Sequence, residues 1–251
     1  MRIDKYLAES LGSRNKAATA IEKGYVKVNG KTVSVSYNVK ENDKIEINTP
    51  EKNFVSVGGF KLQTSLDDFG FSVKGMVFAD IGASTGGFTD CLLQNGAEKV
   101  YCIDVGESQL DKSLYNKNIV VIDNFNARNF SSKLFPEKLD GVVIDVSFIS
   151  LTYVLSGVSQ ALEKGKHVIA LIKPQFECES KSVGKNGIVK DKKTHERIIK
   201  KIYEFALSVE LAPCKLTNAP IIKGKNIEYL ALFEKGASPV SLEQLLKSVV
   251  L

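Results

Sequence analysis

The first 48 residues carry the hydrophobic pattern of a small α+β domain. An apolar face at helical spacing predicts a short amphipathic helix over residues 2–11; its members are Ile3, Tyr6, Leu7 and Leu11. Ser13 is a suitable N-cap for a second helix over residues 15–24, which Gly24 would end. Strand-forming residues then flank the turn pair Asn29-Gly30, which predicts a β-hairpin, and another short strand is expected over residues 44–47.

From residue 57 onward, apolar strands alternate with helices. Continuous apolar runs predict the strands, which we expect over residues 77–82, 99–105, 118–123, 140–147, 167–174, 213–221 and 227–233. Helical periodicity predicts the helices, over residues 86–96, 151–162, 191–208 and 240–250. Apolar strands separated by helices are typical of a mostly parallel sheet with helices on both faces. No helix separates the last two strands, so one of them should run antiparallel.

The two patterns meet at a segment with linker composition. Residues 49–56 contain Pro50 and follow no periodic pattern, so we interpret them as a linker. The predicted organisation is therefore a small domain over residues 1–48, a linker over 49–56 and a larger α/β domain over 57–251.

Composition narrows the class of protein. Of the 251 residues, 43% are hydrophobic and 25% charged, as in ordinary globular proteins. No apolar run reaches the roughly 18–20 residues of a spanning helix, and the charged N-terminus does not resemble a signal peptide, so we expect a cytoplasmic protein. Four scattered cysteines and two histidines predict neither a metal site nor a disulfide framework.

Positive charge is concentrated in two segments of the chain. The net charge is +5, but residues 1–31 hold seven Lys/Arg against three Asp/Glu, and residues 181–201 hold eight against two. Such clusters indicate contact with a polyanion, although lysine-rich helix faces are also often simply solvated.

A glycine-rich loop follows the first strand of the larger domain. The segment from Asp80 to Gly87 reads DIGASTGG and leads directly into a predicted helix. Glycines there allow the backbone to approach a ligand closely, and Asp104, at the end of the next strand, is suitably spaced to bind a ribose diol. The loop thus predicts a nucleoside cofactor. NAD and S-adenosylmethionine both fit this pattern, and a tight turn with no ligand is the alternative.

Four charged residues lie where core elements begin or end. Lys61 opens the helix before the first sheet strand, Asp145 and Lys173 end strands, and Glu228 lies in the last strand. Side chains at the carboxyl ends of parallel strands line the ligand crevice of such sheets. Because burying Asp145 or Lys173 alone would be costly, we expect them to be paired. Any one of the four, taken alone, is equally consistent with a structural salt bridge.

Together, these residues resemble the Lys-Asp-Lys-Glu tetrad of FtsJ-class ribose methyltransferases, in the same chain order. The whole chain is similar to the TlyA family, the haemolysin-named rRNA cytidine 2′-O-methyltransferases. The matching segments are SRNKAATAIEKGYVKVNG, VGGFKLQTSLDDF, DIGASTGGFTDCLLQNGA, DVSFISL, LIKPQFE and NGIVKD. One departure is Val57, which stands where the family usually has arginine.

The resemblance implies a fold and a cofactor. It implies a Rossmann-like S-adenosylmethionine methyltransferase sheet preceded by a small α+β S4 RNA-binding domain. It implies S-adenosylmethionine as cofactor, bound by residues in and around the glycine loop, namely Asp80, Gly82, Ser84, Gly86, Gly87, Phe88, Asp104, Asn126 and Asp145. Phe88 takes the family's aromatic position, and Asn126 stands where related enzymes often carry an acid.

The resemblance also implies the substrate. It implies rRNA, free or in an assembled ribosomal subunit, and the short N-terminus favours the large subunit. The cations expected to contact RNA in the S4-like domain are Arg2, Lys5, Arg14, Lys16, Lys23, Lys27 and Lys31.

The residue types suggest how such a site would work. A ribose hydroxyl needs a base to become a nucleophile, and we assign Lys173 as proton acceptor, with Lys61 orienting the hydroxyl. A nearby Lys61 would favour the neutral form of Lys173, whereas Asp145 would oppose it and is better suited to orienting the base. Glu228 would support the site by hydrogen bonding.

Two alternative functions are a membrane-active haemolysin and a catalytically silent ribosome-binding factor. No strongly amphipathic or membrane-spanning segment is found for the first, and the intact tetrad argues against the second.

Overall fold

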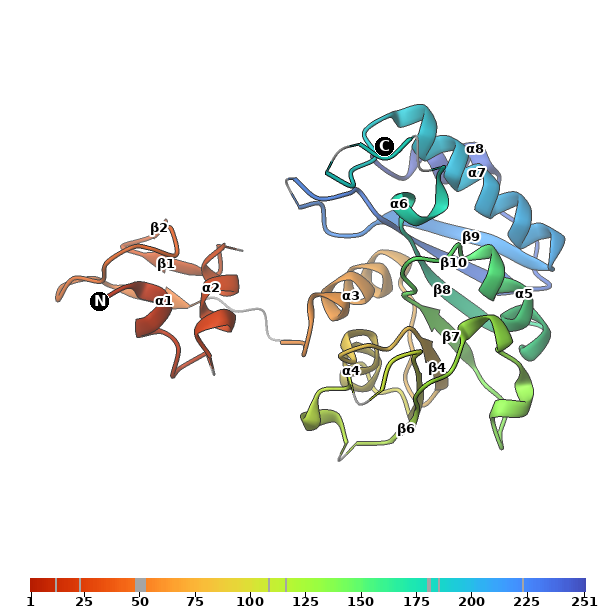
Figure 1. Cartoon of the computed structure of the whole chain (residues 1–251), viewed down its shortest axis with the longest axis horizontal. Coiled ribbons are helices and arrows are strands. Elements are labelled where there is room, and N and C mark those ends of the chain that lie inside the picture. The colour runs from red at the N-terminus through yellow and green to blue at the C-terminus, as the bar shows by residue number, and fades with distance from the viewer. Residues whose placement is uncertain are drawn as a thin grey trace. The chain divides into compact units, whose positions relative to one another are not determined.

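The computed structural model describes all residues except 12, 23, 48–52, 108, 116, 180–181, 185 and 223, and it does not describe the side chain of Lys16. The described chain forms two compact units, residues 1–53 and 54–251 (Figure 1). Most of the predicted linker lies outside the described residues, so the expected boundaries at 48 and 57 stay predictions.

The N-terminal unit packs two short helices against a small sheet. The helices are α1 (Ile3–Tyr6) and α2 (Arg14–Glu22), and the antiparallel strands are β1 (Val26–Val28), β2 (Lys31–Thr32) and β3 (Ile45–Ile47), in the order β2-β1-β3. Positive φ angles at Asn29 (52°) and Gly30 (77°) form the predicted hairpin turn between β1 and β2.

The first helix differs from its prediction. It is a single turn, and residues 7–11 continue as turns rather than as helix. Ile3 and Leu7 are buried, as expected for the apolar face, but Tyr6 is 53% exposed and does not belong to it. Leu11 is partly buried and packs against the same core, so the prediction was wrong for Tyr6 only.

The larger unit is built on a seven-stranded sheet. Its strands are β4 (Val77–Ile81), β5 (Lys99–Ile103), β6 (Ile119–Ile122), β7 (Gly141–Ile144), β8 (His167–Ile172), β9 (Leu211–Asn218) and β10 (Tyr229–Lys235). The spatial order is β6-β5-β4-β7-β8-β10-β9, and β4 to β8 are parallel. β10 is antiparallel to both neighbours, which confirms the expectation drawn from the missing helix before it.

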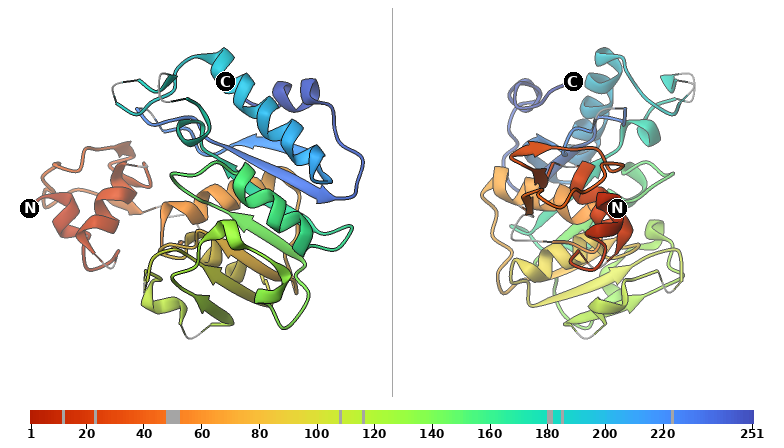
Figure 2. Two further views of the ribbon diagram at one scale, coloured as in Figure 1. Left: turned by 45° about the vertical axis from the view of Figure 1, so that its right-hand side comes forward. Right: turned by 90° about the vertical axis from the view of Figure 1, so that its left-hand side faces the viewer.

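Helices cover both faces of this sheet, as the apolar strands predicted (Figure 2). The α-helices of the unit are α3 (Val57–Phe69), α4 (Gly87–Gln94), α5 (Thr152–Ala161), α6 (Pro174–Glu177), α7 (Lys192–Ser208) and α8 (Leu242–Lys247). Single 3-10 turns are η1 (Lys112–Leu114), η2 (Ala127–Asn129) and η3 (Ser132–Leu134).

Alternate residues of the strands supply two separate cores. Val77, Ala79 and Ile81 of β4 pack in the core formed with α5 and α7. Phe78 lies between Val77 and Ala79 and packs on the other face, in the core formed with α3 and α4. Because side chains alternate along a strand, the central strands β4, β5, β7 and β8 bury apolar groups on both faces. The sheet is therefore held rigid, and its carboxyl edge is a fixed platform for the loops that follow the strands.

Candidate active site

The four charged residues singled out from the sequence meet at the carboxyl edge of the sheet. Asp145 directly follows β7, and Lys173 directly follows β8. Glu228 precedes β10, which runs antiparallel to β8, so it reaches the same edge. Lys61 comes from the second turn of α3, rather than from its first residue as expected. The topology thus gathers residues up to 167 positions apart in the chain.

The charges pair across this edge. Lys173 Nζ lies 2.6 Å from Asp145 Oδ1, and Lys61 Nζ donates to Glu228 Oε2 at 2.6 Å. The side chains are 11% and 20% exposed in the first pair and 21% and 14% exposed in the second. The pairing expected for Asp145 and Lys173 is confirmed. Each lysine has a carboxylate beside it, so both are held in place yet remain open to the solvent side.

Neutral polar groups extend both pairs. Lys173 Nζ also donates to Ser147 Oγ at 2.8 Å, and Gln175 Nε2 donates to Glu228 Oε1 at 3.2 Å. The local sequence explains the first contact: Lys173 precedes Pro174, which disfavours helical backbone at Lys173 and starts α6 at its first position. β8 therefore ends in an extended lysine whose side chain turns toward the loop after β7.

Two adjoining hollows lie at this edge. The smaller, of about 180 Å³, is lined among others by Lys61, Lys173, Gly87 and Phe88. The larger, of about 510 Å³, lies along the end of β5 and the loop after β7. They share four lining residues, namely Gly82, Ser84, Asp145 and Ser147. The larger hollow has the size of a small-molecule cofactor site, and it opens next to the paired lysines.

The glycine loop is shaped by its own packing. Gly82 has φ +84°, and a Cβ there would lie 2.6 Å from the carbonyl oxygen of Asp145. Gly86 has φ +89°, and a Cβ there would collide with Leu114. These positions require glycine because of the surrounding protein, whatever ligand the loop accepts. Gly82 in particular brings the loop into contact with the backbone of the residue that pairs with Lys173.

A second close approach connects the loop to Lys61. A Cβ on Gly59 of α3 would lie 2.9 Å from the Gly87 carbonyl oxygen, and one on Gly87 would lie 2.9 Å from the Gly59 nitrogen. The glycines of the two motifs therefore let α3 and α4 meet at their first turns. This contact carries Lys61 to the edge of the loop.

The acids of the loop region have different environments. Asp104 accepts hydrogen bonds from the backbone N–H groups of Ser84 and Gly106, each at 2.8 Å, and lines the larger hollow. Its oxygens retain acceptor capacity for a ribose diol. Asp80 is fully buried and accepts from the N–H and the hydroxyl of Thr89 at the start of α4. Burial raises the pKa of Asp80 to about 7.

The other residues expected at the cofactor lie as follows. Phe88 is buried in the core beneath α3 and α4 and also lines the smaller hollow. Asn126 is exposed, lines the larger hollow and caps η2 by accepting from the N–H of Arg128. Their assignment to the cofactor stays a prediction.

Sequence reasoning missed an aromatic pair at the mouth of the site. Phe148 is 86% exposed and has φ +65°, and its ring lies 4.8 Å from that of Phe176. Lys173 Nζ lies 5.9 Å from the centroid of the Phe176 ring. An exposed phenylalanine in left-handed backbone is unusual and indicates a functional site. The signal was present in DVSFISL, where a large apolar residue follows a charged strand end.

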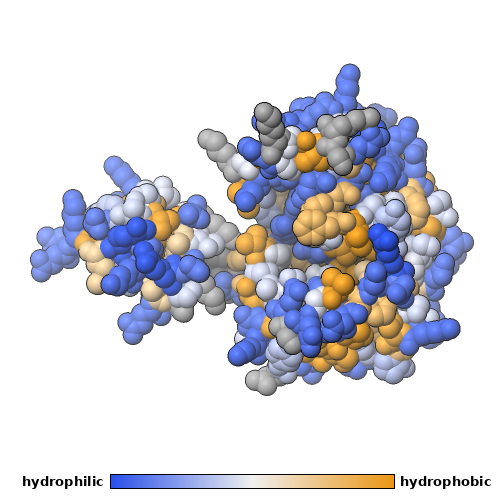
Figure 3. Space-filling model, viewed as in Figure 1, coloured by the Kyte–Doolittle hydropathy of each residue, from blue (hydrophilic) through white to orange (hydrophobic). Residues whose placement is uncertain are grey.

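In the space-filling view, apolar surface gathers near the middle of this unit's face (Figure 3).

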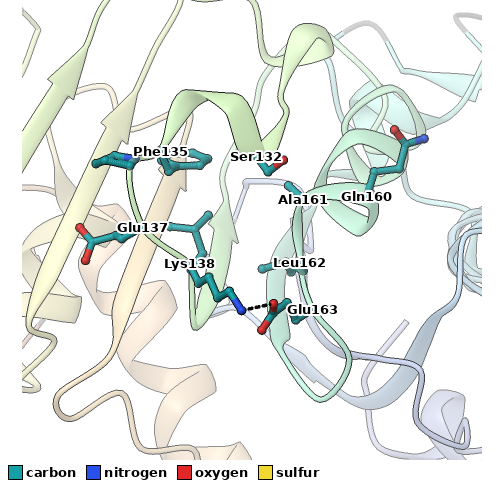
Figure 4. A pocket seen from close by; sticks show the side chains of 10 residues that line it. Ser132, Phe135, Glu137, Lys138, Gln160, Ala161, Leu162 and Glu163 are labelled. Carbon is teal, nitrogen blue, oxygen red and sulfur yellow. Dashed lines mark ion pairs between the residues drawn. The ribbon is translucent and has the colours of Figure 1, made fainter.

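A further hollow of about 430 Å³ lies at the opposite edge of the sheet. Its lining precedes β7 and β8 in the chain, and the ion pair Lys138–Glu163, 2.6 Å long, crosses it (Figure 4). None of the four paired residues lines it. It is therefore separate from the candidate active site.

In the N-terminal unit, two of the predicted RNA-binding cations share one acid. Arg14 Nε lies 2.8 Å and Arg2 Nε 3.1 Å from the buried carboxylate of Asp4. Burial tends to raise the pKa of Asp4, but the hydrogen bonds from Arg14 and Arg2 outweigh burial and hold it below its usual value. Lys5 and Lys31 are exposed and Lys27 is half-buried, while Lys23 and the side chain of Lys16 lie outside the described residues.

The larger unit has the features of a Rossmann-type methyltransferase. Helices cover both faces of a parallel sheet with an antiparallel β10, and a glycine loop with a hollow beside it follows the first strand. A family model for FtsJ-like methyltransferases matches residues 54–235, and one for the S4 domain matches residues 1–45. The chain belongs to the TlyA family of FtsJ-like methyltransferases that carry an S4 domain.

Relatives match over nearly their whole length. Hemolysin A of Brachyspira hyodysenteriae is 41% identical over 93% of this chain and 99% of its own. The 23S rRNA (cytidine-2′-O)-methyltransferase TlyA of Campylobacter jejuni is 36% identical over 94% of this chain and 100% of its own. A solved hemolysin-named structure from Streptococcus thermophilus is 34% identical, covers 98% of this chain and 94% of its own, and gives a TM-score of 0.74.

A more distant structure shares the fold alone. An S-adenosylmethionine-dependent methyltransferase from Mesorhizobium loti is 12% identical, with a TM-score of 0.53 over 72% of this chain and 100% of its own. Within the described part of the chain, no helix is both long and apolar enough to cross a membrane.

Proposed function

We propose that this protein transfers a methyl group from S-adenosylmethionine to the ribose 2′-hydroxyl of a cytidine in rRNA, and that its substrate is large-subunit rRNA. The observation that carries the proposal is the meeting of the pairs Lys173–Asp145 and Lys61–Glu228 around one hollow beside the glycine loop. S-adenosylmethionine is the cofactor of this methyltransferase fold and family. With rRNA as its substrate, the protein would act in the cytoplasm.

The larger hollow has the volume and the polar groups for an adenosine moiety. Asp104 would accept from the ribose diol, and Asn126 would face the base, with Gly82 and Ser84 forming the floor. The cofactor, when bound, supplies a methyl group on a sulfonium, which needs only an aligned nucleophile. The chain's own residues must therefore hold the ribose oxygen in line and remove its proton.

The paired lysines divide this work. Lys173 would accept the proton from the 2′-hydroxyl, and Asp145 would hold the lysine in position and stabilise the charge that develops on it. Lys61, held by Glu228, would donate a hydrogen bond that orients the hydroxyl oxygen. Gln175 would keep the Glu228 carboxylate facing Lys61.

Several features support an RNA substrate. The S4 unit carries exposed arginines preorganised by Asp4, and its visible face is largely hydrophilic (Figure 3). At the catalytic unit, the exposed ring of Phe148 offers a stacking surface for a base drawn out of its helix. Lys192, Lys193 and Arg197 on the exposed side of α7 would add phosphate contacts.

The choice of the large subunit is supported by the relatives. The Campylobacter protein, named for 23S rRNA, matches over its entire length. The Mycobacterium tuberculosis protein named for both 16S and 23S rRNA, 37% identical, aligns over 74% of this chain and 71% of its own.

The test is methylation of purified subunits and of free rRNA with labelled S-adenosylmethionine. Label in alkali-resistant dinucleotides with cytidine on the 5′ side, from 50S subunits alone, is the expected result. Label in 30S particles as well would overturn the large-subunit choice, and alkali-sensitive label would overturn ribose as the target. If no RNA is labelled although the protein binds S-adenosylhomocysteine and 50S subunits, it is a silent ribosome-binding factor.

A further inference from the structure

The ε-amino group of Lys173 has one ion-pair partner and one hydrogen-bond acceptor on the same loop. Asp145 Oδ1 lies 2.6 Å from Lys173 Nζ, and Ser147 Oγ accepts a hydrogen bond from it at 2.8 Å. Asp145 and Ser147 both follow β7, two residues apart, and both line the two hollows at the carboxyl edge. Ser147 is not one of the four charged residues, and the proposed function assigns it no role.

The hydrogen bond to Ser147 matters because of the shape of an amine. A neutral lysine side chain has two N–H bonds and one lone pair in a tetrahedral arrangement. The ion pair with Asp145 holds Nζ near the carboxylate, but among the described residues Asp145 Oδ1 accepts no hydrogen bond, so this contact alone does not fix the rotation about the Cε–Nζ bond. With one N–H held by the Ser147 hydroxyl, the lone pair has two remaining directions, and the negative charge of Asp145 disfavours the one that faces the carboxylate.

We propose that Ser147 is a positioning residue that aims the lone pair of Lys173 at the ribose 2′-hydroxyl. This inference rests on the proposed function. In the reaction, the bond between the 2′-oxygen and the methyl carbon forms while the methyl–sulfur bond breaks and leaves its electron pair on sulfur. The hydroxyl proton moves to the lone pair of Lys173, which becomes an ammonium with three N–H bonds. One of these already donates to Ser147, and the Asp145 carboxylate lies beside the ammonium as its counter-charge.

The loop that carries Ser147 is held at both ends. At its start, the N–H of Asp145 donates to the carbonyl oxygen of Ile81 at 2.9 Å. At its far end, the buried carboxylate of Glu177 accepts from the N–H of Leu151 at 2.6 Å and from the hydroxyl of Ser150 at 2.6 Å. A flexible loop could not direct a hydroxyl, so this bracing is what a positioning role requires.

The backbone conformation beside Ser147 also supports a positioning role. Phe148 has φ +65°, a conformation that costs a non-glycine residue free energy and persists only where the surroundings enforce it. The reversal at Phe148 leaves its ring exposed, while the Ser147 side chain contacts Lys173.

The experiment compares Ser147→Ala with Ser147→Thr in the full chain. Ser147 is exposed, so the additional methyl group of threonine has room while the hydroxyl is kept. Single-turnover methylation of 50S subunits should fall about 10- to 100-fold in Ser147→Ala, as expected for the loss of one hydrogen bond to the reacting base. The Ser147→Thr variant should recover most of the rate. KM for the subunit and affinity for S-adenosylhomocysteine, measured by calorimetry, should not change.

Ser208→Ala is the matched control, because that exposed hydroxyl bonds only within its own helix, to the carbonyl of Phe205. A Ser147→Ala enzyme with the wild-type rate would overturn the inference. So would a loss that Ser147→Thr does not restore, or one that appears in KM or cofactor affinity instead of the transfer rate. Failure of the wild-type protein itself to methylate RNA would refute the proposed function, which separates the two outcomes.

Discussion

Removing the amine of Lys173 is the sharpest perturbation of the proposed reaction. Lys173→Ala takes away the proton acceptor but leaves Asp104, Asn126 and the glycine loop in place. General-base catalysis commonly contributes about 100- to 10,000-fold in rate, or about 3–5 kcal/mol in the barrier. We therefore expect methyl transfer to fall by that factor with little change in the affinity for S-adenosylhomocysteine.

The same substitution has a structural cost that must be separated from the chemical one. It leaves the Asp145 carboxylate, 20% exposed, without its cation. Breaking a fully buried pair costs about 3–5 kcal/mol, and solvent reaches this one, so about 1–3 kcal/mol of stability is the expected loss. Globular proteins typically have an unfolding free energy of about 5–15 kcal/mol, so we expect the variant to stay folded.

The chain offers a matched control on the same two strands. Lys166, just before β8, lies 2.6 Å from Asp140, just before β7, and both are 32% exposed. Lys166→Ala removes a lysine–carboxylate pair from the opposite edge of the sheet, at a cost of about 1 kcal/mol or less. It should be destabilised but fully active.

The assay is single-turnover transfer of label to 50S subunits, with urea denaturation and calorimetry on the same preparations. A Lys173→Ala enzyme within tenfold of the wild-type rate would falsify the role of Lys173 as base. An equal loss in Lys166→Ala would show that the rate reports on stability rather than on chemistry.

Three further predictions test other parts of the molecule. Asp104→Ala should weaken S-adenosylhomocysteine binding at least tenfold in calorimetry, whereas unchanged binding would place the cofactor elsewhere. Arg14→Glu in the full chain should weaken rRNA binding and flatten the slope of log K against log salt by roughly 0.7–0.9 per lost phosphate contact. The charge reversal Lys247→Glu on α8 is its control. Equal slopes for the two variants would exclude Arg14 as an RNA contact. Burial raises the pKa of Asp80 from 3.8 to about 7, so between these pH values the native state retains a proton that the unfolded state releases. The free energy of unfolding should therefore fall by about 4 kcal/mol as pH rises through this range. Urea denaturation at pH 5 and pH 8 should show no such fall in Asp80→Asn, and an unchanged pH dependence would contradict the prediction.

The local pattern of the sequence determined the elements and the class of fold. Apolar runs predicted the central strands of the larger sheet, since strands buried on both faces need apolar side chains on both. The missing helix between the last two strands predicted the antiparallel direction of β10. The hairpin at Asn29-Gly30 followed from residues that tolerate positive φ. Short-range preferences sufficed in these cases because each concerns neighbouring residues.

The same reasoning failed where a short segment depends on what packs against it. The helix expected over residues 2–11 is one turn; Ile3, Leu7 and Leu11 pack in the core, whereas Tyr6 is 53% exposed and does not. For the site, the sequence predicted that Asp145 and Lys173 are paired, but it named no partner for Lys61. It placed Lys61 near Lys173, and both line the smaller hollow, while the structure pairs Lys61 with Glu228 at 2.6 Å.

Contacts between distant segments were decided only by the tertiary structure. Positions 59 and 87 have no room for a Cβ because α3 and α4 meet there. Gly82 has none because the backbone of Asp145 passes beside it. The hydrogen bond from Lys173 to Ser147 joins the ends of two strands 26 residues apart. Sequence patterns record the preferences of each segment for burial and backbone conformation. Which side chains meet depends on strand order and register, and these are set by the packing of the whole sheet.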